Sequence, residues 1–156
     1  MAIAVFDIDG VVADVRHRLH LVEKRPKDWP AFFAAAADDP ALDAGIARVL
    51  AAAAEHELVW LTGRPSSLRA VTARWLADHR LPAAELIMRG GRDFRPAPVL
   101  KLEELERLRP REVGLFVDDD HKVVAAALGA GFPAVLADWM APSPALSDAQ
   151  DRAGRS

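Results

Sequence analysis

The sequence predicts an α/β fold in which a mainly parallel sheet carries helices on both faces. Short apolar runs rich in β-branched residues recur along the chain, and a segment with helical periodicity follows most of them. Because parallel strands are joined by crossover connections, such alternation is typical of a sheet that is buried on both sides. A chain of 156 residues suits one domain of this kind.

The first half of the chain supplies two strands and two helices of this pattern. Residues 2–8, AIAVFDI, are apolar on both faces, as a buried parallel strand would be. Residues 46–53 carry apolar side chains at helical spacing, and residues 57–61, ELVWL, predict the second strand. A second helical pattern covers residues 68–76, and Pro65 suits the first turn of that helix.

The second half repeats the alternation. Residues 85–88, ELIM, predict a short third strand, and leucines recur at helical spacing over residues 102–108. Residues 112–117, EVGLFV, predict the fourth strand, and residues 123–128 a helix that Gly129 or Gly131 would close. A last strand is expected in FPAVLA, residues 132–137.

Two segments depart from the alternation. Residues 14–43 hold two short helical patterns, and we interpret them as a small helical insertion whose aromatic stripe packs onto the core. Residues 142–156 are rich in Pro, Ser, Ala and Asp with little apolar content, so we expect a flexible tail there. The folded domain is accordingly expected to cover residues 1–141.

Composition excludes several classes of protein. Apolar residues make up 51% of the chain, which is unlike a disordered protein, and the net charge of −3 gives no global attraction to nucleic acid or to an anionic membrane. The absence of cysteine excludes disulfides and thiolate chemistry. No signal peptide or membrane span is recognisable, so we expect a cytoplasmic protein without a membrane partner.

Two carboxylates interrupt the first strand run at its end. Asp7 and Asp9 alternate with apolar residues, so their side chains point to the same side, and Gly10 then allows a sharp turn. Ligands of open α/β sheets bind at the carboxyl ends of the strands. The pair becomes tolerable if a divalent cation binds between the carboxylates or if one of them keeps a proton. Capping or turn formation is the alternative explanation.

Two other strand ends carry polar groups that strengthen the functional interpretation. Thr62, Gly63 and Arg64 offer a hydroxyl, a backbone amide and a guanidinium, which together suit a phosphate, although an N-cap threonine would explain the first of them. Three consecutive acids, residues 118–120, follow the fourth strand and are poorly tolerated without a cation. Lys101, at the expected start of a helix, could counter their charge.

At this point the sequence resembles the haloacid dehalogenase superfamily of phosphotransferases. The run DIDGVV resembles its first motif, Thr62 its second, Lys101 its third and DDD at 118–120 its acidic fourth, in the family's order. A finer similarity is to the 3′-phosphatase domain of phage-type polynucleotide kinase–phosphatases, which rests on TGR, RPAPVLK and an arginine shortly after the first motif, here Arg16 or Arg18. Two departures are Val11, where threonine is usual, and Asp120, where arginine is frequent.

The resemblance implies a fold and a set of roles. It implies a Rossmann-like, doubly wound fold with a minimal helical cap. It also implies a nucleophile at Asp7 and a general acid and base at Asp9, whose proton the neighbouring acids would favour. The resemblance further implies a Mg²⁺ cofactor held by the Asp7 carboxylate, the Asp9 carbonyl, Asp119 directly and Asp118 as an outer or second ligand. Phosphoryl oxygens would be held by Thr62, the Gly63 amide and Lys101, and the substrate contacted by Arg64 and by Arg16 or Arg18.

The resemblance also suggests what the site would act on. Neither usual place for a cap domain has room for a large one, so an open site is expected that admits a polymer end or a protein-borne phosphate. Two basic groups could steer a phosphate chain or be ordinary solvated charges: Lys24, Arg25 and Lys27 in the first gap, and Arg89, Arg92 and Arg95 in the second. The expected activity is Mg²⁺-dependent phosphomonoester hydrolysis through an aspartyl-phosphate, removing 3′-phosphates from nucleic-acid ends in repair.

Alternatives remain open. The four motifs are equally compatible with a small-molecule phosphatase acting on nucleotides. A receiver-type signalling domain also uses strand-end acids, a Thr and a Lys, but its lysine follows the acids, whereas Lys101 precedes them. A catalytically inactive binding module is the third alternative. The chain has no phosphate-binding P-loop, which is compatible with a kinase or ligase partner on another chain.

Overall fold

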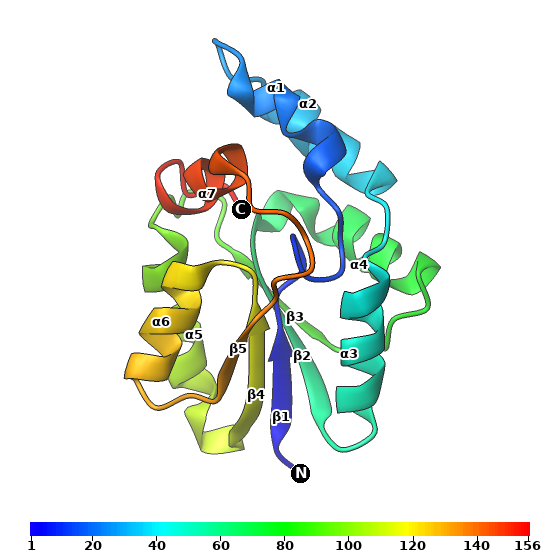
Figure 1. The fold of residues 1–156 in the computed structure, drawn as a ribbon, viewed down its shortest axis with the longest axis vertical. Coiled ribbons are helices and arrows are strands. Elements are labelled where there is room, and N and C mark those ends of the chain that lie inside the picture. Colours follow the sequence, from blue (N-terminus) through cyan, green and yellow to red (C-terminus); the bar gives the residue numbers. More distant parts are fainter.

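The computed structural model describes residues 1–156 and confirms the predicted fold class. Five strands form one sheet in the order β3-β2-β1-β4-β5, and every neighbouring pair is parallel (Figure 1). The strands are β1 (Ile3–Phe6), β2 (Glu57–Pro65), β3 (Glu85–Arg89), β4 (Val113–Asp118) and β5 (Ala134–Leu136). The two central strands beside β1 are therefore β2 and β4, which carry the motifs of the second and fourth strand ends.

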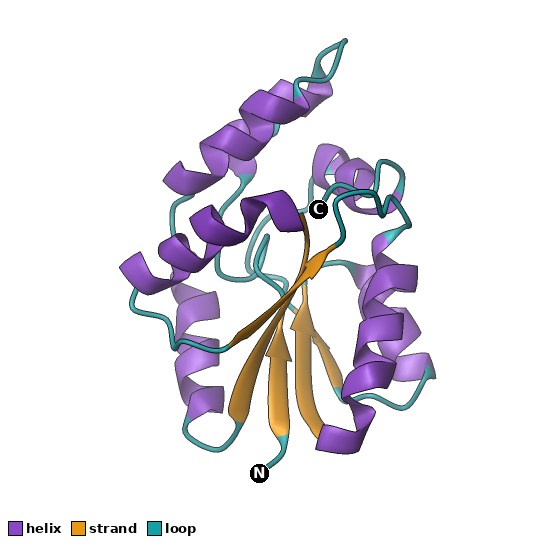
Figure 2. Ribbon diagram, turned by 180° about the vertical axis from the view of Figure 1, so that it is seen from behind, coloured by secondary structure: helices purple, strands orange, loops and turns teal.

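Helices cover both faces of the sheet (Figure 2). They are α3 (Asp43–Ala53), α4 (Arg69–Asp78), α5 (Ala97–Leu108) and α6 (His121–Gly129), with short 3₁₀ turns at Ser66–Leu68 and Arg109–Arg111. Alternate residues of β1 point to opposite faces: Ala4 and Phe6 pack in one core with α3 and α4, and Ile3 and Val5 pack in the other with α5 and α6. The sheet is thus doubly wound, as predicted.

The insertion after β1 forms a third, smaller cluster above the carboxyl ends of the strands (Figure 1). Its short helices are Arg16–Arg18, α1 (His20–Glu23), α2 (Trp29–Ala34) and Ala35–Asp38. The aromatic stripe of α2 packs on itself, with the Trp29 and Phe32 rings 5.8 Å apart edge to face. Phe32 is buried with Val15, Leu19 and Val22 in this third cluster, so the stripe has a packing role, but in a small core of its own and not on the core of the sheet as expected.

Residues 142–156 differ from the flexible tail that the sequence predicts. Pro144–Asp151 form α7, which the Ser143 hydroxyl caps. Its Leu146 is buried in the cluster of the insertion, and its Ala149 is buried as well. An ion pair of 2.8 Å between Lys27 and Asp148 adds to this contact. Because α7 buries only a few side chains, its apolar pattern is too sparse to recognise in the sequence.

Two element boundaries also differ from the expectation. The second strand continues past Leu61 through the TGR motif to Pro65, and all of these residues are buried. The helix that carries Lys101 begins earlier, at Ala97, since Pro98 is tolerated in a first turn. Lys101 therefore lies in the second turn of α5, one helical turn deeper over the sheet than predicted. None of the helices combines the length and apolar character needed to cross a bilayer.

Candidate active site

The site forms where the carboxyl ends of β1, β2 and β4 meet. Phe6 of β1 pairs with Trp60 of β2 and with Val117 of β4, so the residues that follow these three lie at one edge of the sheet. The Asp7 amide continues the ladder by donating to the Val117 carbonyl over 3.0 Å. Parallel topology thus brings the three polar strand ends predicted from the sequence to one place.

Lys101 joins the first and fourth motifs. Its ammonium lies 3.0 Å from the Asp7 carboxylate and 2.6 Å from that of Asp118, and all three side chains are buried. Burial disfavours the charged form of Lys101, but the two carboxylates outweigh it and raise the pKa of the ammonium, which stays protonated. Lys101 is therefore a fixed positive charge beside the predicted nucleophile.

Three carboxylates surround this single ammonium. Asp7, Asp118 and Asp119 each offer an oxygen within 4.8 Å of the others. Burial, followed by repulsion from Asp118, raises the pKa of Asp7 to about 7, and burial together with Asp7 raises the pKa of Asp119 well above its ordinary value. One lysine does not neutralise three acids, so the cluster fits a divalent cation with a preference for hard oxygen ligands such as Mg²⁺.

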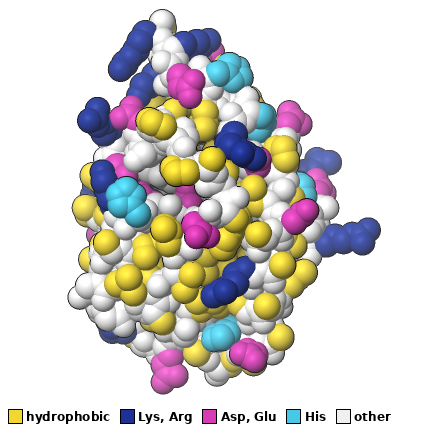
Figure 3. Space-filling view, viewed as in Figure 1, with side chains coloured by type: hydrophobic (Ala, Val, Ile, Leu, Met, Phe, Trp, Pro, Cys, Tyr) yellow, Lys and Arg dark blue, Asp and Glu magenta, His cyan; other side chains and the backbone are white.

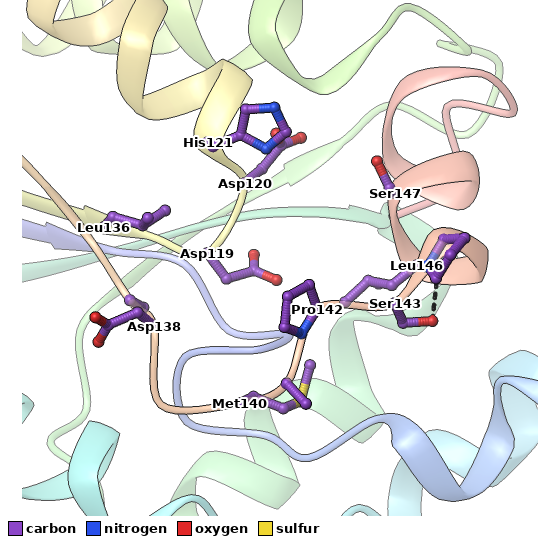
Figure 4. Close-up of a pocket in the computed structure, with 13 residues that line it drawn as sticks. Asp119, Asp120, His121, Leu136, Asp138, Met140, Pro142, Ser143, Leu146 and Ser147 are labelled. Carbon is purple, nitrogen blue, oxygen red and sulfur yellow. Dashed lines mark hydrogen bonds between the residues drawn. The ribbon is translucent and has the colours of Figure 1, made fainter.

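Asp119 is reached from a neighbouring cavity of about 340 Å³. The cavity lies between the carboxyl end of β4 and the loop that leads to α7, and the Asp119 carboxylate points into it beside Pro142 (Figure 4). The Gln150 amide of α7 donates to Asp119 over 3.2 Å. A close approach at Gly10, whose φ is +78°, leaves room for the Asp119 side chain, which occupies the space of a Cβ there. Asp119 is the acid of the triplet best placed for a cation from solvent.

Asp120 has a different place from the other two acids. Its carboxylate accepts from the Lys122 amide over 2.9 Å and caps α6. Its second oxygen is buried without a hydrogen-bond partner and faces Asp151 at the end of α7. Burial, followed by the neighbouring carboxylate of Asp120, raises the pKa of Asp151 to about 7. The third acid thus serves the helix and α7, not the carboxylate cluster.

A buried network of two arginines and two aspartates holds Asp9. Arg64 donates to Asp9 Oδ1 over 2.9 and 2.6 Å and to Asp39 over 3.0 Å. Arg18 donates to Asp39 over 2.8 and 3.0 Å and reaches Asp9 at 3.4 Å. None of the four side chains is more than 4% exposed. Because every charge is paired within the network, its burial is tolerated.

This network corrects the expected protonation of Asp9. Burial alone would raise its pKa, but the guanidiniums of Arg64 and Arg18 outweigh burial and lower the pKa of Asp9 to about 2. The neighbouring acids instead raise the pKa of Asp7 and Asp119. Asp9 is therefore ionised in the free protein, since two guanidiniums face its carboxylate, whereas Asp7 faces one ammonium and the carboxylates of Asp118 and Asp119.

The structure brings one of the two candidate arginines to the site. Arg18 lies in the network, whereas Arg16 is exposed and pairs with Asp14 over 2.9 and 2.6 Å. Arg64, expected to contact the substrate, is instead turned toward Asp9 and the Thr72 hydroxyl, which it reaches at 3.1 Å. Asp39 was not among the predicted site residues, because residues 38–40, DDP, at the end of a short helix are typical of an ordinary turn.

Thr62 and Gly63 line the floor of the site next to Asp9. The Thr62 hydroxyl is buried and accepts from the Arg64 amide over 3.1 Å. A side chain at Gly63 would collide with the backbone carbonyl of Ser156, which lies directly over it. The Arg89 guanidinium donates to the Gly63 carbonyl over 2.7 Å and to the Ser156 carbonyl over 3.2 Å. Ser156 is thus a site residue that sequence reasoning missed, whereas Arg89, named above among the basic residues that could steer a phosphate chain, is buried here.

Most of the basic residues expected along a nucleic-acid path are already engaged. Arg89 is buried, Arg95 pairs with Asp93 and Glu103, and Lys27 pairs with Asp148. Figure 3 shows basic side chains at the end of the molecule that the insertion forms. Of the six residues, only Arg25 and Arg92 are exposed without an ion pair.

Comparisons with known proteins agree with this geometry. Residues 1–135 match the family model described as the polynucleotide kinase PNKP phosphatase domain. A candidate nucleotidase of Halalkalibacterium halodurans is 31% identical over 85 residues, which are 54% of this chain and 38% of that protein. The chain thus spans well under half the length of this curated relative.

Solved structures share the fold. A chain of the Pnkp1/Rnl/Hen1 RNA repair complex matches with a TM-score of 0.69 and 24% identity, over 87% of this chain and 42% of that one. The haloacid dehalogenase-like protein SP0104 of Streptococcus pneumoniae matches with a TM-score of 0.65 and 12% identity, over 97% and 92% of the two chains. These likenesses place the sheet and its helices in the haloacid dehalogenase-like fold.

Proposed function

Because the chain belongs to the family of polynucleotide kinase–phosphatase phosphatase domains, within the haloacid dehalogenase superfamily, we propose that it is a Mg²⁺-dependent phosphomonoesterase that removes 3′-phosphates from nucleic-acid ends. The observation that carries the proposal is the Asp7 carboxylate at the end of β1, held 3.0 Å from the Lys101 ammonium. A carboxylate placed between a fixed cation and a carboxylate cluster suits attack on a phosphoryl group.

Asp7 is the proposed nucleophile. In the first step its oxygen attacks phosphorus, the bond from phosphorus to the 3′-oxygen breaks, and the 3′-oxygen leaves as a hydroxyl after taking a proton from Asp9. In the second step water attacks the phosphorus of the aspartyl-phosphate, Asp9 takes a proton from the water, and Asp7 leaves as a carboxylate. Phosphate and a 3′-hydroxyl end are the products.

The proton for the first step needs a source, because Asp9 is ionised in the free protein. A phosphate monoester has a second pKa of about 6, so near neutral pH part of the substrate carries a proton of its own. We assign Asp9 to relay that proton to the leaving oxygen. Its low pKa then makes Asp9 a carboxylate again, ready to accept the proton of the attacking water.

Thr62, the Gly63 amide and Lys101 would hold the phosphoryl oxygens as negative charge shifts among those oxygens in the transition state. Asp7, Asp119, Asp118 and the Asp9 carbonyl would hold Mg²⁺, and the clustering of the three carboxylates within 4.8 Å supports that set. When bound, the ion would neutralise the acids and polarise the phosphoryl group. Arg18 and Arg64 would act through Asp9, which they orient.

The likeness to the chain of an RNA repair complex supports a nucleic-acid end as substrate and a ligase or kinase partner on another chain. A second candidate is a nucleotide phosphatase, which the partial match to a candidate nucleotidase favours. Both candidates use the same chemistry at Asp7. They differ in whether the substrate extends beyond one nucleotide.

A substrate panel with Mg²⁺ separates the candidates. It compares 3′-phosphorylated oligonucleotides, 5′-phosphorylated oligonucleotides, 3′-mononucleotides and sugar phosphates, with the Asp7→Asn protein purified in parallel as the background. We expect the highest kcat/KM for the 3′-phosphorylated oligonucleotide. If the 3′-mononucleotide is equal or better at both low and moderate salt, the polynucleotide substrate is wrong and the nucleotide phosphatase replaces it.

A further inference from the structure

The end of the described chain lies inside the site and not beside it. After α7 the backbone turns back over the carboxyl ends of the strands (Figure 1), and Ser156 is only 5% exposed. The Ser156 hydroxyl donates to Asp9 Oδ2 over 2.8 Å. Its carbonyl lies against Gly63 and accepts from Arg89 over 3.2 Å. A hydroxyl thus already occupies the position next to the proposed general acid and base.

The preceding residue lies between two aromatic rings. The Arg155 guanidinium is 4.4 Å from the centre of the Phe94 ring and 5.4 Å from that of Trp29. Trp29 belongs to α2 of the insertion, and Phe94 to the loop between β3 and α5, where it is 49% exposed. Gly154, with φ of +60°, brings the backbone against the Phe94 carbonyl, where a Cβ would collide. The turn at Gly154 therefore seats Arg155 in this slot.

The arrangement has the chemistry of a nucleotide end. An alcohol oxygen contacts Asp9, and one residue away a planar group lies between two aromatic rings, as a 3′-oxygen and its base would. We propose that residues 152–156 occupy the place of the substrate's terminal nucleotide, and that Trp29 and Phe94 form the slot that receives its base. The assignment of the alcohol oxygen rests on the proposed function of Asp9.

Binding of the substrate then requires only the segment after α7 to move. Leu146 packs in the core of the insertion and Ala149 is buried, so α7 can stay in place. Residues 152–156 contribute few buried side chains beyond Ser156, and the contacts of Arg155 and Ser156 are the ones that a nucleotide would replace. Residues 152–156 thus compete with the substrate for the site, and weakening the contacts of this segment is expected to strengthen binding of the substrate.

Two variants of the 156-residue chain test the slot. Phe94→Ala removes one ring from a half-exposed loop position, and Arg155→Ala removes the present occupant. Leu128→Ala on α6 is the matched control, since Leu128 is a 54% exposed apolar residue remote from the site. Each variant is made in the Asp7→Asn background, so that affinity is measured by fluorescence anisotropy without turnover. The probes are 3′-phosphorylated oligonucleotides that end in a normal or an abasic residue, and a 3′-hydroxyl oligonucleotide.

We expect Phe94→Ala to raise the Kd for the base-bearing end by at least about 5-fold, as loss of one stacking partner does, and to leave the abasic end unchanged. Arg155→Ala should lower the Kd for the base-bearing end, and Leu128→Ala should change neither. In proteins that keep Asp7, Phe94→Ala should raise KM for the base-bearing end with little change in kcat, which a folding defect would not do.

Equal effects of Phe94→Ala on both ends would overturn the slot. A weaker affinity of the Arg155→Ala protein for both ends would overturn the competition, because Arg155 would then be a phosphate contact. If the Asp7→Asn protein without a further substitution binds phosphorylated and 3′-hydroxyl ends equally, the proposed function itself fails, and the slot fails with it. The three results are distinct, so the failure of the inference is not confused with that of the function.

Discussion

Replacing Asp39 with Asn tests the network that holds Asp9. Asp39 accepts hydrogen bonds from Arg18 over 2.8 and 3.0 Å and from Arg64 over 3.0 Å, and it is 3% exposed. The substitution keeps the shape of the side chain and removes its charge. Two buried guanidiniums then share the single carboxylate of Asp9, and part of their charge is left without a partner.

The expected loss of stability follows from this burial. Removing one partner of a buried ion pair destabilises a protein by about 3–5 kcal/mol, and the amide of Asn retains some hydrogen bonding, so we expect about 3 kcal/mol for Asp39→Asn. In a domain of this size each kcal/mol shifts Tm by roughly 2–4 °C, which gives a fall of about 6–12 °C. Asp9 should also lose its fixed orientation, and kcat should fall with it.

Asp38→Asn is the matched control, since it makes the same change at the preceding residue, which is exposed. Surface substitutions of this kind stay within about 0.5 kcal/mol of the parent. Thermal and urea unfolding followed by circular dichroism measure both variants. If Asp39→Asn and Asp38→Asn have the same free energy of unfolding, the network does not hold the site together.

Other parts of the structure give further expectations. The pKa of Asp151 rises from 3.8 in the unfolded chain to about 7 in the folded protein, so the folded state binds an extra proton and loses stability as pH rises through that range. Asp151→Asn should therefore raise the free energy of unfolding by about 1–3 kcal/mol at pH 8 and by much less at pH 5. An equal gain at both pH values would contradict the pairing with Asp120. A chelator should abolish phosphatase activity, and Mg²⁺ at 100 times its Kd should stabilise the protein by about 2.7 kcal/mol. This gain in stability should be lost in Asp119→Ala and kept in Asp120→Ala. The reverse order would mean that the acidic triplet is misassigned. If Arg25 and Arg92 each neutralise one phosphate of a single strand, the logarithm of affinity should fall against the logarithm of salt with a slope of about −1.4, and Arg92→Ala should halve it; an unchanged slope would remove Arg92 from the path.

The strand-end residues could be predicted because their placement depends on local sequence and on parallel topology. Asp7, Thr62 and Asp118 each come at the end of an apolar run of a strand, and parallel strands bring their carboxyl ends to one edge. Lys101 required only a helix that packs over the same edge. Nothing in this part of the site depends on how irregular segments fold.

The remainder depends on contacts that a sequence pattern does not show. Asp39 and Arg18 meet because an insertion without strong periodicity folds over the strand ends, and the orientation of Arg64 toward Asp9 decides which carboxylate is ionised. Ser156 reaches Asp9 across 147 residues of sequence separation through a segment with few apolar side chains. The charge state of Asp9 and the occupation of the site by Ser156 can therefore be recognised only from the folded structure.

The most direct test of the proposed chemistry is release of phosphate from a 3′-phosphorylated oligonucleotide with Mg²⁺, measured for the parent protein and for Asp7→Asn. The substitution leaves the size of the side chain unchanged and removes the attacking oxygen anion. We expect the parent to release phosphate and the Asp7→Asn protein, with an unchanged circular dichroism spectrum, to be slower by at least about 10³-fold, within the range that loss of a nucleophile causes. Comparable rates for the two proteins would contradict an aspartyl-phosphate at Asp7.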